Sequence, residues 1–400
     1  MRFFHLGLAH LPLTKTFQSC AFTQKLIKMN RMLLSLGHEV YAFGCRAVDE
    51  PPIEDYYQSE RFHFIETHSL RDVAKDYGEG YNLPDGNGLN YPWRTTDFRH
   101  DFNAERKPST LKFYAKCIEY INRIKKPDDF LLITQGSYHK PIDDAVKLYL
   151  TCEPGVGYRG SYCRFRAFES SYIQNFSYGS RYPYECINGN YYDRVIPNYF
   201  DPEDFEFSSE KEDYYLYIGR MIRRKGILTA IMTCNAIGKK LILVGQGATV
   251  QGGKLIAQDF TAEPGTWEYQ GFADAEKRKK LMSKAIATFT PTEYLECFAG
   301  THVESMISGT PPITTNFGVF PETIPSVLMG KVGFRCNTLQ DFVDAAIRAR
   351  DVNHEEVRRY GERFLMDNVK WEYEKWFSDM YAVWESTDGK RKGWHRLNVR

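Results

Sequence analysis

Hydrophobic positions near the start of the chain follow first the period of a strand and then that of a helix. Residues 2–9 alternate between faces, and apolar residues recur at helical spacing over 21–36 before Gly37. Residues 38–44 form a second apolar run. Strand, helix and strand in this order make a βαβ unit, which predicts a parallel, Rossmann-like first half.

The rest of the first half is less regular. Residues 50–108 are polar and weakly periodic, which predicts an insertion with short elements. A helix is expected over 110–124, and buried strands over 130–134 and 147–151. The loop 135–140 follows the first of these strands, at the sheet edge where open parallel sheets bind ligands.

A second series of strands and helices follows a charged, linker-like run at 208–213. Strands are expected over 214–218, 240–244, 267–271 and 287–291, with helices over 227–237 and 275–284. This α/β pattern predicts two Rossmann-like domains, residues 1–205 and 206–368. Residues 369–400 form a last long helix and a basic tail.

The most informative stretch is 291–323. Val303, Met306 and Ile307 share one helix face and should pack inward. Glu296 precedes this helix and Glu304 lies a turn inside it. A helix start offers free N–H groups to phosphate, and carboxylates bind hydroxyls, so the stretch suits a nucleotide sugar. The alternative is a surface loop, a buried helix and two solvated glutamates.

Composition limits the class of protein. A hydrophobic content of 42% predicts a globular chain, and a net charge of +1 gives no global attraction to nucleic acid or anionic membrane. Nine scattered cysteines, without a C-x-x-C pair, indicate a reducing compartment. No apolar run approaches the length of a membrane span. We therefore expect a soluble, cytoplasmic protein.

Five motifs in the second half resemble a known family. They are VIPNYFD at 195–201, YIGRMIRRKG at 217–226, LILVGQG at 241–247, YQGFADAEKRKKLM at 269–282 and ECFAGTHVE at 296–304. Together they look like the retaining GT-B glycosyltransferases of family 4, glycosyl transferases group 1. The resemblance is specific over 195–335 and looser before it, and the whole chain is similar to members from phage and environmental genomes. It implies two Rossmann-like domains facing across a cleft, with the last helix returning to the first domain.

The same resemblance implies a role for each matching residue. Arg220 and Lys225 match the basic pair that neutralises the departing nucleoside diphosphate, a charge that fixed cations stabilise. Glu296 matches the carboxylate beside the donor sugar and the reaction centre, and Glu304 the one that binds ribose hydroxyls. Further donor contacts are implied for Gly219, Gly245, Gly247, Phe298, Ala299 and Gly300. The alternative for the basic pair is solvated surface charge.

The expected reaction needs neither a metal nor a cofactor. No D-x-D triplet occurs in the chain, so the metal-chelating signature of the other large glycosyltransferase fold is missing. The family is thought to use front-side attack, in which the leaving phosphate accepts the proton of the acceptor hydroxyl. We expect a hexose or pentose to move from a UDP-glucose-like donor to an acceptor hydroxyl, with the nucleotide sugar as co-substrate.

One departure from the family pattern concerns Glu153. Many members place a histidine after the corresponding strand, whereas this chain reads Cys152-Glu153-Pro154. Glu153 could bind a sugar hydroxyl, align the acceptor, or simply cap the following loop. His139 is a nearby alternative, although lone histidines are more often structural.

The same resemblance implies that the first domain binds the acceptor. Residues 155–194 hold eleven aromatic residues and five arginines, and 90–107 also mix cations with aromatic rings. Candidate acceptor contacts are Tyr158, Arg159, Arg164 and Arg166, with His139. Such a surface suits sugar rings, core packing, or flipped bases, since some phage glycosyltransferases modify hydroxymethylated bases in DNA. Carbohydrate and hydroxymethylated pyrimidine therefore both stay open. An inactive nucleotide-sugar- or DNA-binding module is a third interpretation, and the oligomeric state is open.

Overall fold

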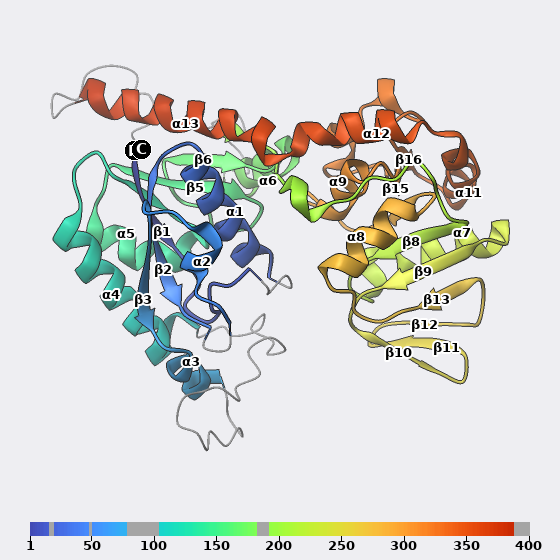
Figure 1. Cartoon of the computed structure of the whole chain (residues 1–400), viewed down its shortest axis with the longest axis horizontal. Helices are drawn as coiled ribbons and strands as arrows, with labels where there is room; N and C mark the ends of the chain where they lie inside the picture. The colour runs from blue at the N-terminus through green and yellow to red at the C-terminus, as the bar shows by residue number, and fades with distance from the viewer. Residues whose placement is uncertain (16–19, 48–49, 78–103, 182–191, 388–400) are drawn as a thin grey trace. The chain divides into compact units, whose positions relative to one another are not determined.

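The computed structural model describes residues 1–15, 20–47, 50–77, 104–181 and 192–387. The chain divides into two compact units (Figure 1). Unit 1 comprises Met1–Phe168, Phe176–Ile196 and the chain from Lys370 onward. Unit 2 comprises Glu169–Asn175 and Pro197–Val369. Each unit contains its own parallel sheet with helices packed against it, as the sequence predicts for two Rossmann-like domains.

Unit 1 contains a seven-stranded parallel sheet with the order β3-β2-β1-β4-β5-β6-β7. The strands are β1 (Arg2–Leu6), β2 (Glu39–Cys45), β3 (Phe62–His68), β4 (Phe130–Leu132), β5 (Leu150–Val156), β6 (Phe165–Phe168) and β7 (Arg194–Val195). The helices are α1 (Ala21–Ser35), α2 (Ile53–Tyr57), α3 (Leu70–Tyr77), α4 (Pro108–Ile124) and α5 (Lys140–Val146), with α13 (Met366–Thr387) at the C-terminal end.

The strand period places helices on both faces of this sheet. Phe4 of β1 packs in one core cluster with Phe113 of α4. The neighbouring Phe3 points to the other face, where its ring lies 4.9 Å from that of Phe377 in α13. Successive strand residues therefore contact different helices, as the pleat requires.

Residues 50–77 are not an irregular insertion, so that prediction is wrong for this part. They form α2, β3 and α3, and β3 extends the parallel sheet through pairs such as Val40 with Phe62. Because β3 is the edge strand, several of its residues stay partly exposed, and its sequence lacks the continuous apolar run of a central parallel strand. Residues 78–103 lie outside the described part of the chain.

Unit 2 contains a six-stranded parallel sheet with the order β13-β9-β8-β14-β15-β16. The strands are β8 (Tyr214–Ile218), β9 (Lys240–Val244), β13 (Trp267–Tyr269), β14 (Thr288–Thr290), β15 (Pro312–Thr315) and β16 (Phe334–Cys336). The helices are α6 (Ser171–Arg181), whose first five residues belong to unit 2, α7 (Ile227–Ile237), α8 (Ala275–Lys284), α9 (Gly300–Ile307), α10 (Phe320–Thr323), α11 (Leu339–Arg348) and α12 (His354–Gly361).

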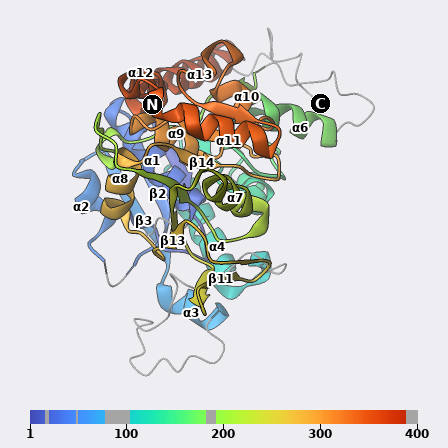
Figure 2. The same cartoon turned by 90° about the vertical axis from the view of Figure 1, so that its right-hand side faces the viewer.

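Side chains of β8 alternate between two cores in unit 2. Tyr215 and Tyr217 pack with α7 and α11, which lie side by side (Figure 2). Tyr214 and Leu216 point the other way, into a cluster with Met282 of α8. Val303, Met306 and Ile307 of α9 are all buried, which confirms the predicted inward face of this helix.

A small antiparallel sheet interrupts the alternation of strands and helices in unit 2. It consists of β10 (Ala248–Gln251), β11 (Lys254–Ala257) and β12 (Thr261–Ala262). The hydrophobic pattern did not predict it, because β10 is largely exposed and buries no residue fully. The pair Gly252 and Gly253, both with positive φ, is the hairpin signal that could have found it.

Short 3-10 helices complete the description. They are η1 (Ala104–Arg106), η2 (Gly136–His139), η3 (Pro202–Asp204), η4 (Arg223–Lys225), η5 (Ser326–Leu328), η6 (Ala349–Asp351) and η7 (Glu362–Phe364). Of these, η4 carries Lys225 and η2 carries His139, both predicted site residues. In the described part of the chain, no helix combines the length and apolar character that crossing a bilayer requires.

The last helix attaches to unit 1 through buried contacts along one face. Trp376 is 2% exposed, and its indole N–H donates to the Tyr192 carbonyl at 3.2 Å. His38, directly before β2, forms a hydrogen bond of 2.7 Å with Glu374 of α13. From Lys370 onward the helix therefore belongs to the first sheet's unit.

We predict that Trp376→Ala will lower the free energy of unfolding by about 3–5 kcal/mol, because it leaves a cavity under α13. Trp371 lies on the same helix but is 61% exposed, so Trp371→Ala should change stability by less than about 1 kcal/mol. Urea denaturation of the two variants measures the difference. Equal losses would show that α13 does not depend on its buried face.

Candidate functional site

The carboxyl ends of the unit 2 strands surround a hollow of about 90 Å³, which we call the α9 hollow. It is lined by Tyr217, Ile218, Gly219, Lys225, Phe289, Thr290, Thr292, Glu296, Ala299, Gly300 and Thr301. Five of these residues, Gly219, Lys225, Glu296, Ala299 and Gly300, are predicted site residues. Ligands of open parallel sheets bind at this edge of the strands.

An ion pair lies at the centre of the α9 hollow. Lys225 Nζ donates to Glu296 Oε1 at 2.5 Å, and the Tyr294 hydroxyl donates to the same oxygen at 2.7 Å. Lys225 Nζ also lies 5.0 Å from the centre of the Tyr294 ring, and the Arg224 guanidinium 5.1 Å. Burial raises the pKa of Tyr294, and the charge of Glu296 adds to this, so the phenol stays a donor. Sequence reasoning missed Tyr294.

Two backbone segments meet closely to form this pair. Gly226 has φ 75°, and a Cβ at this position would lie 1.7 Å from the Pro291 carbonyl oxygen. Beside it, Glu293 N donates to Arg224 O at 2.9 Å. The loop that carries Lys225 and the loop that carries Glu296 are therefore joined backbone to backbone, which only glycine at 226 allows.

The start of α9 is held in a strained conformation. Its N-cap residue, Ala299, has φ 58° and ψ 62°, a left-handed geometry that costs a non-glycine residue about 1–2 kcal/mol. The buried His302 stabilises it, since Nδ1 donates to Ala299 O at 2.5 Å while Nε2 accepts from the Thr323 hydroxyl at 2.7 Å. The first N–H groups of the helix, at Gly300 and Thr301, line the hollow and suit an anion.

Glu304 lies one turn into α9 and outside the lining of the α9 hollow. Its Oε2 is 4.0 Å from Nη1 of Arg278, a cation on α8 that the sequence did not single out. A Cβ on Gly300 would be 3.8 Å from Glu304 Oε1, so this carboxylate lies beside the helix start, with its side chain 16% exposed. Phe298 is buried, and its ring packs 6.1 Å from that of Phe364, so only its backbone is available to a ligand.

The predicted glycines prove to serve the protein's own backbone. A Cβ on Gly245 would lie 1.8 Å from the Gly219 carbonyl oxygen, and Gly245 has φ 149°. Gly219 N donates to Val244 O at 3.0 Å, so the two loops are bonded together. Gly247 has φ 105° and follows in the same turn. Close packing between loops thus explains Gly245 without a bound nucleotide.

Arg220 is exposed at the rim of this region. Its carbonyl accepts from the Tyr217 hydroxyl at 3.1 Å, which fixes the backbone and leaves the guanidinium in solvent. Burial raises the pKa of Tyr217, and the positive charge of Arg220 partly offsets this increase. The guanidinium therefore lies close to the Tyr217 hydroxyl. The structure therefore places Arg220 near the hollow but not in its lining.

Two further residues that sequence reasoning missed support the loops. The Ser170 hydroxyl donates to Cys297 O at 2.6 Å, directly after Glu296 in the chain. Asp259 accepts from Arg223 N at 3.0 Å and so caps η4 from the small antiparallel sheet. Ser170 also accepts from Ile173 N at 3.3 Å, so its position before α6 is an N-cap signal that could have been read. Asp259 carries no local signal.

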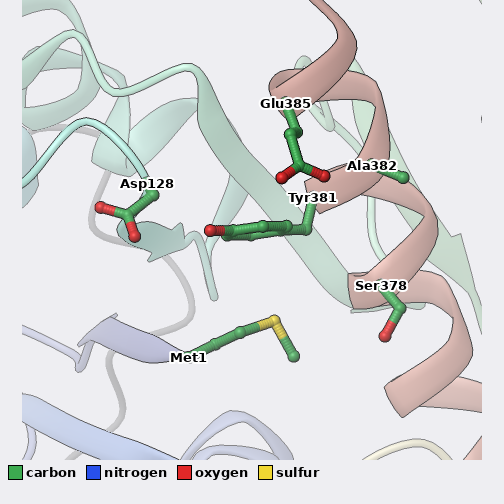
Figure 3. Close-up of a pocket in the computed structure, with 6 residues that line it drawn as sticks. All are labelled: Met1, Asp128, Ser378, Tyr381, Ala382 and Glu385. Carbon is green, nitrogen blue, oxygen red and sulfur yellow. The ribbon is translucent and has the colours of Figure 1, made fainter.

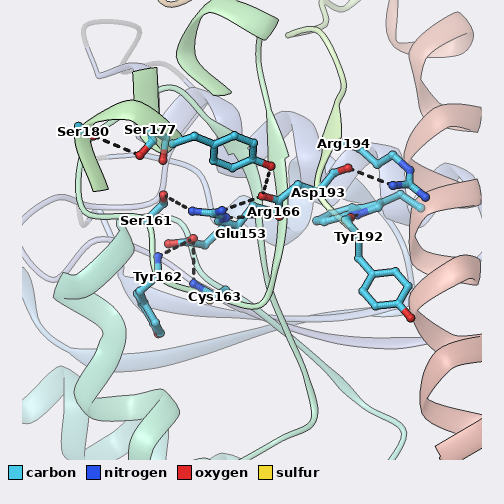
Figure 4. A network of polar contacts seen from close by, with 12 residues as sticks. Glu153, Ser161, Tyr162, Cys163, Arg166, Ser177, Ser180, Tyr192, Asp193 and Arg194 are labelled. Atoms are coloured by element: carbon cyan, nitrogen blue, oxygen red, sulfur yellow. Dashed lines mark hydrogen bonds and ion pairs between the residues drawn. The ribbon is translucent and has the colours of Figure 1, made fainter. Parts of the chain in front are cut away.

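Glu153, the predicted orienting residue, is fully buried in β5 of unit 1 (Figure 4). Its Oε2 accepts from Tyr162 N at 3.0 Å and Cys163 N at 3.3 Å. Its Oε1 is buried without a hydrogen-bond partner. Burial raises the pKa of Glu153 to about 8, against the opposing effect of these N–H groups and of Arg166. The structure therefore places Glu153 as an anchor of the β5–β6 loop.

Arg166 belongs to the same buried network rather than to an exposed acceptor surface. It is 1% exposed and pairs with Asp193 at 2.7 Å, while the Tyr178 hydroxyl donates to that carboxylate at 2.8 Å (Figure 4). Its guanidinium also donates to Ser161 Oγ at 3.3 Å. A buried, hydrogen-bonded arginine of this kind holds the core of unit 1 together.

The other predicted acceptor residues are spread through unit 1. The guanidinium of Arg159 lies 5.3 Å from the centre of the Phe176 ring. The guanidinium of Arg164 lies 5.1 Å from the centre of the Tyr149 ring. Arg159 is exposed and Arg164 half-buried, so both keep surface for a ligand. These two pairs do not by themselves define a site.

Tyr158 and His139 take up packing positions. The ring of Tyr158 lies 5.6 Å from that of Phe22, and the side chain is half-buried. His139 is fully buried, with its ring 5.8 Å from that of Phe113. Burial lowers the pKa of His139 to about 3, so it is a neutral core residue at physiological pH.

A larger hollow in unit 1, of about 410 Å³, contains none of the predicted site residues. Met1 and Asp128 line one side, and Ser378, Tyr381, Ala382 and Glu385 of α13 line the other (Figure 3). Across the residues that the structure describes, no group of three or more His, Cys, Asp or Glu side chains is arranged to hold a metal ion.

Comparison with known proteins relates the second half of the chain to one family. Residues 201–362 match the family model described as Glycosyl transferases group 1, and this range contains the whole α9 hollow. No curated protein matches the chain. The second half of the chain therefore contains a glycosyl transferases group 1 domain.

Solved glycosyltransferase structures share the fold over almost the whole chain. AviGT4, a glycosyltransferase involved in avilamycin A biosynthesis, is 17% identical with a TM-score of 0.61, over 96% of this chain and 98% of its own. Sucrose-phosphate synthase from Thermosynechococcus elongatus is 15% identical with a TM-score of 0.64, over 96% and 99%. HepE from Anabaena, solved with UDP and glucose, is 11% identical with a TM-score of 0.59, over 95% and 100%. The architecture is thus that of GT-B glycosyltransferases.

We predict that Gly245→Ala will destabilise the protein by more than about 3 kcal/mol, because its methyl group would overlap the Gly219 carbonyl and force the loops apart. Gly252 also has positive φ, at 56°, but no atom lies within 4 Å of its missing Cβ. Gly252→Ala should therefore cost only the backbone strain, about 1 kcal/mol. Thermal unfolding compares them, and similar shifts for both variants would contradict the close approach.

We also predict a pH-dependent effect of Glu153→Gln. The pKa of Glu153 is raised from 4.5 to about 8 in the folded protein, so the folded state holds a proton that the unfolded state releases between these pH values. The free energy of unfolding of the wild type is therefore highest below pH 4.5 and falls as pH rises to 8. The variant should therefore gain stability relative to wild type, on the order of 4 kcal/mol, between pH 5 and pH 8.5. Denaturant unfolding at both pH values measures it. The exposed Glu119→Gln is the control, and a constant difference for Glu153→Gln would disprove the buried neutral acid.

Proposed function

We propose that this chain is a retaining glycosyltransferase of family 4 type. It transfers a hexose or pentose from a UDP-glucose-like donor to an acceptor hydroxyl. The observation that carries this proposal is the Lys225–Glu296 ion pair beside the N-terminus of α9, at the carboxyl ends of β8 and β14. A cation, a carboxylate and free helix N–H groups in one hollow match the three parts of a nucleotide sugar.

In the protein without ligand, Lys225 and Glu296 neutralise each other. The diphosphate of a donor is the stronger partner for Lys225, and Arg220 lies close enough to share it. Glu296 would then be released to accept hydrogen bonds from the sugar hydroxyls, with Tyr294 still holding its Oε1. Glu304, beside Gly300 at the helix start, would accept hydrogen bonds from the ribose hydroxyls. Donor binding would thus replace the internal ion pair with one between Lys225 and the diphosphate, and with hydrogen bonds from sugar hydroxyls to Glu296.

The proposed chemistry is a front-side displacement. The bond between the anomeric carbon and the diphosphate oxygen breaks, and the acceptor oxygen bonds to the same face of that carbon. The acceptor proton passes to the departing phosphate oxygen. Arg220, Lys225 and the α9 N–H groups stabilise the negative charge on the leaving group. Because protein cations supply this stabilisation, we propose that the reaction is independent of a metal ion.

We propose a carbohydrate acceptor rather than a base in DNA. The basic and aromatic segment 155–194 suggested stacking on bases, but Arg166 is used in a buried pair and Phe165 and Phe168 are core residues. HepE, of the same fold, was solved in complex with UDP and glucose, so this fold accommodates a sugar as well as a nucleotide, in line with a carbohydrate acceptor here. The scattered cysteines fit action in the reducing cytoplasm, of a host cell if the chain is phage-encoded.

The test is sugar transfer from a panel of nucleotide sugars to simple sugars and to hydroxymethylcytosine DNA. Arg220→Ala with Lys225→Ala should reduce transfer by more than about 1,000-fold, because it removes charge stabilisation of the leaving group. Lys254→Ala removes an exposed lysine of β11 and should leave transfer unchanged. Chelation of metal ions should also have no effect.

Each other outcome points elsewhere. Full activity in the double variant would overturn the assigned leaving-group cations, and loss on chelation would overturn metal independence. Product on the modified DNA alone would assign the DNA acceptor. Donor binding without any transfer would indicate an inactive nucleotide-sugar-binding module.

A further inference from the structure

A second charged hollow lies at the opposite edge of the unit 2 sheet. It measures about 250 Å³ and is lined by Lys211, Glu212, Asp213, Ile286, Arg350 and His354. Strands β8 and β14 begin next to it, at Tyr214 and Thr288, and end at the α9 hollow. Drug-sized ligands occupy about 300–1,000 Å³, so this volume suits a smaller group. We call it the Lys211 hollow.

Lys211 is an ammonium group held without a charged hydrogen-bond partner. Its Nζ donates to the Ser283 carbonyl at 2.7 Å and to the Thr310 hydroxyl at 2.9 Å. Burial lowers the pKa of Lys211 to about 7, and the nearby charge of Lys284 lowers it further. An ammonium group has three N–H donors, so one remains for a ligand in the hollow.

The surrounding charges are unbalanced. Asp213 is shared between two cations, Arg350 and Lys239, the latter at 3.1 Å. The lining holds two cations, Lys211 and Arg350, and two carboxylates, those of Glu212 and Asp213. Lys239, which pairs with Asp213, and Lys284, whose charge acts on Lys211, lie outside the lining and make the surroundings net positive, which favours an anionic ligand.

His354 completes the wall of this hollow. Its Nδ1 donates to the Gly309 carbonyl at 3.0 Å. Burial lowers the pKa of His354 to about 4, and the charge of Lys211 contributes. The charge of Lys211 therefore disfavours protonation of His354, a repulsion that a bound anion would reduce.

We propose that the Lys211 hollow binds a phosphate group, free or carried on a small metabolite, at a site separate from the α9 hollow. Lys211 supplies an N–H donor and Arg350 a guanidinium, while the neutral His354, whose Nδ1–H is already donated to Gly309 O, forms part of the wall. A phosphate group fits because it is compact and doubly charged and accepts several hydrogen bonds at once. The ligand would lie between the starts of β8 and β14, so it would stabilise unit 2 on binding.

The proposed site responds to pH through its buried lysine. Lys211 gains its charge as pH falls through about 7, so anion affinity should rise in the same range. The other charged side chains around the hollow are Arg350, Lys239, Lys284, Asp213 and Glu212, and His354 titrates only near pH 4. Sulfate is the probe for this dependence because it remains a dianion throughout, whereas phosphate itself gains a proton near pH 6–7.

The experiment is titration calorimetry of the full chain with sulfate, inorganic phosphate, glucose 6-phosphate and glucose. We expect sulfate to bind at least threefold more tightly at pH 6.2 than at pH 8.2, and glucose not to bind. Lys211→Met and Arg350→Gln should each weaken sulfate binding at pH 6.2 at least tenfold. Tighter binding of glucose 6-phosphate than of phosphate would identify a phosphorylated metabolite, and the reverse a free phosphate; either supports the site.

Three control variants keep the proposal falsifiable. Lys254→Met, at an exposed lysine of β11, should leave binding unchanged. Lys225→Met tests whether the anion occupies the α9 hollow instead, and loss of binding in that variant alone would overturn the proposal. Unchanged binding in Arg350→Gln, a substitution at a partly exposed side chain that should fold normally, would also overturn it, as would absence of sulfate binding to the wild type.

Discussion

The site in unit 2 depends on one close backbone approach. Gly226 and Pro291 come so near that no side chain fits between them, and this contact joins the turn after β8 to the turn after β14. Lys225 comes directly before Gly226, and Glu296 follows a few residues after Pro291. Their ion pair is therefore a result of backbone packing, and Tyr294 then fixes the geometry from the carboxylate side.

Periodicity in the sequence was sufficient wherever a segment is buried on a regular face. Residues 240–244 were predicted as a strand and form β9, and Val303 and Met306 lie on the buried face of α9 as expected. The pattern failed at exposed edges. Strand β3 borders its sheet and β10 is largely solvated, so neither shows the continuous apolar run that identifies central parallel strands.

Residues of the candidate site that lie within short sequence motifs could be predicted from the sequence. The motifs around Lys225 and Glu296 lie 71 residues apart, and the structure places their charged groups 2.5 Å apart. Tyr294 and His302 act through contacts with side chains or carbonyls whose position only the fold determines, so no spacing rule identified them. In unit 1 the sequence suggested an exposed acceptor contact that the structure does not show. Arg166 was predicted as a surface cation, because only the fold brings its partner Asp193 beside it.

The short segment Glu169–Asn175 has a consequence for how this protein can be divided. It belongs to unit 2 although Phe176–Ile196 of unit 1 separates it from the rest of that unit in the chain. Glu322 accepts hydrogen bonds at 2.8 Å from Ser171 N and Tyr172 N, and Ser170 holds the Cys297 carbonyl. The run 208–213, predicted as a linker from its composition, lies inside unit 2, and a gene fragment that begins there would encode most of unit 2 without the segment Glu169–Asn175. An exchange of units between related proteins must therefore keep Glu169–Asn175 together with Pro197–Val369, because unit 2 is not continuous in the sequence.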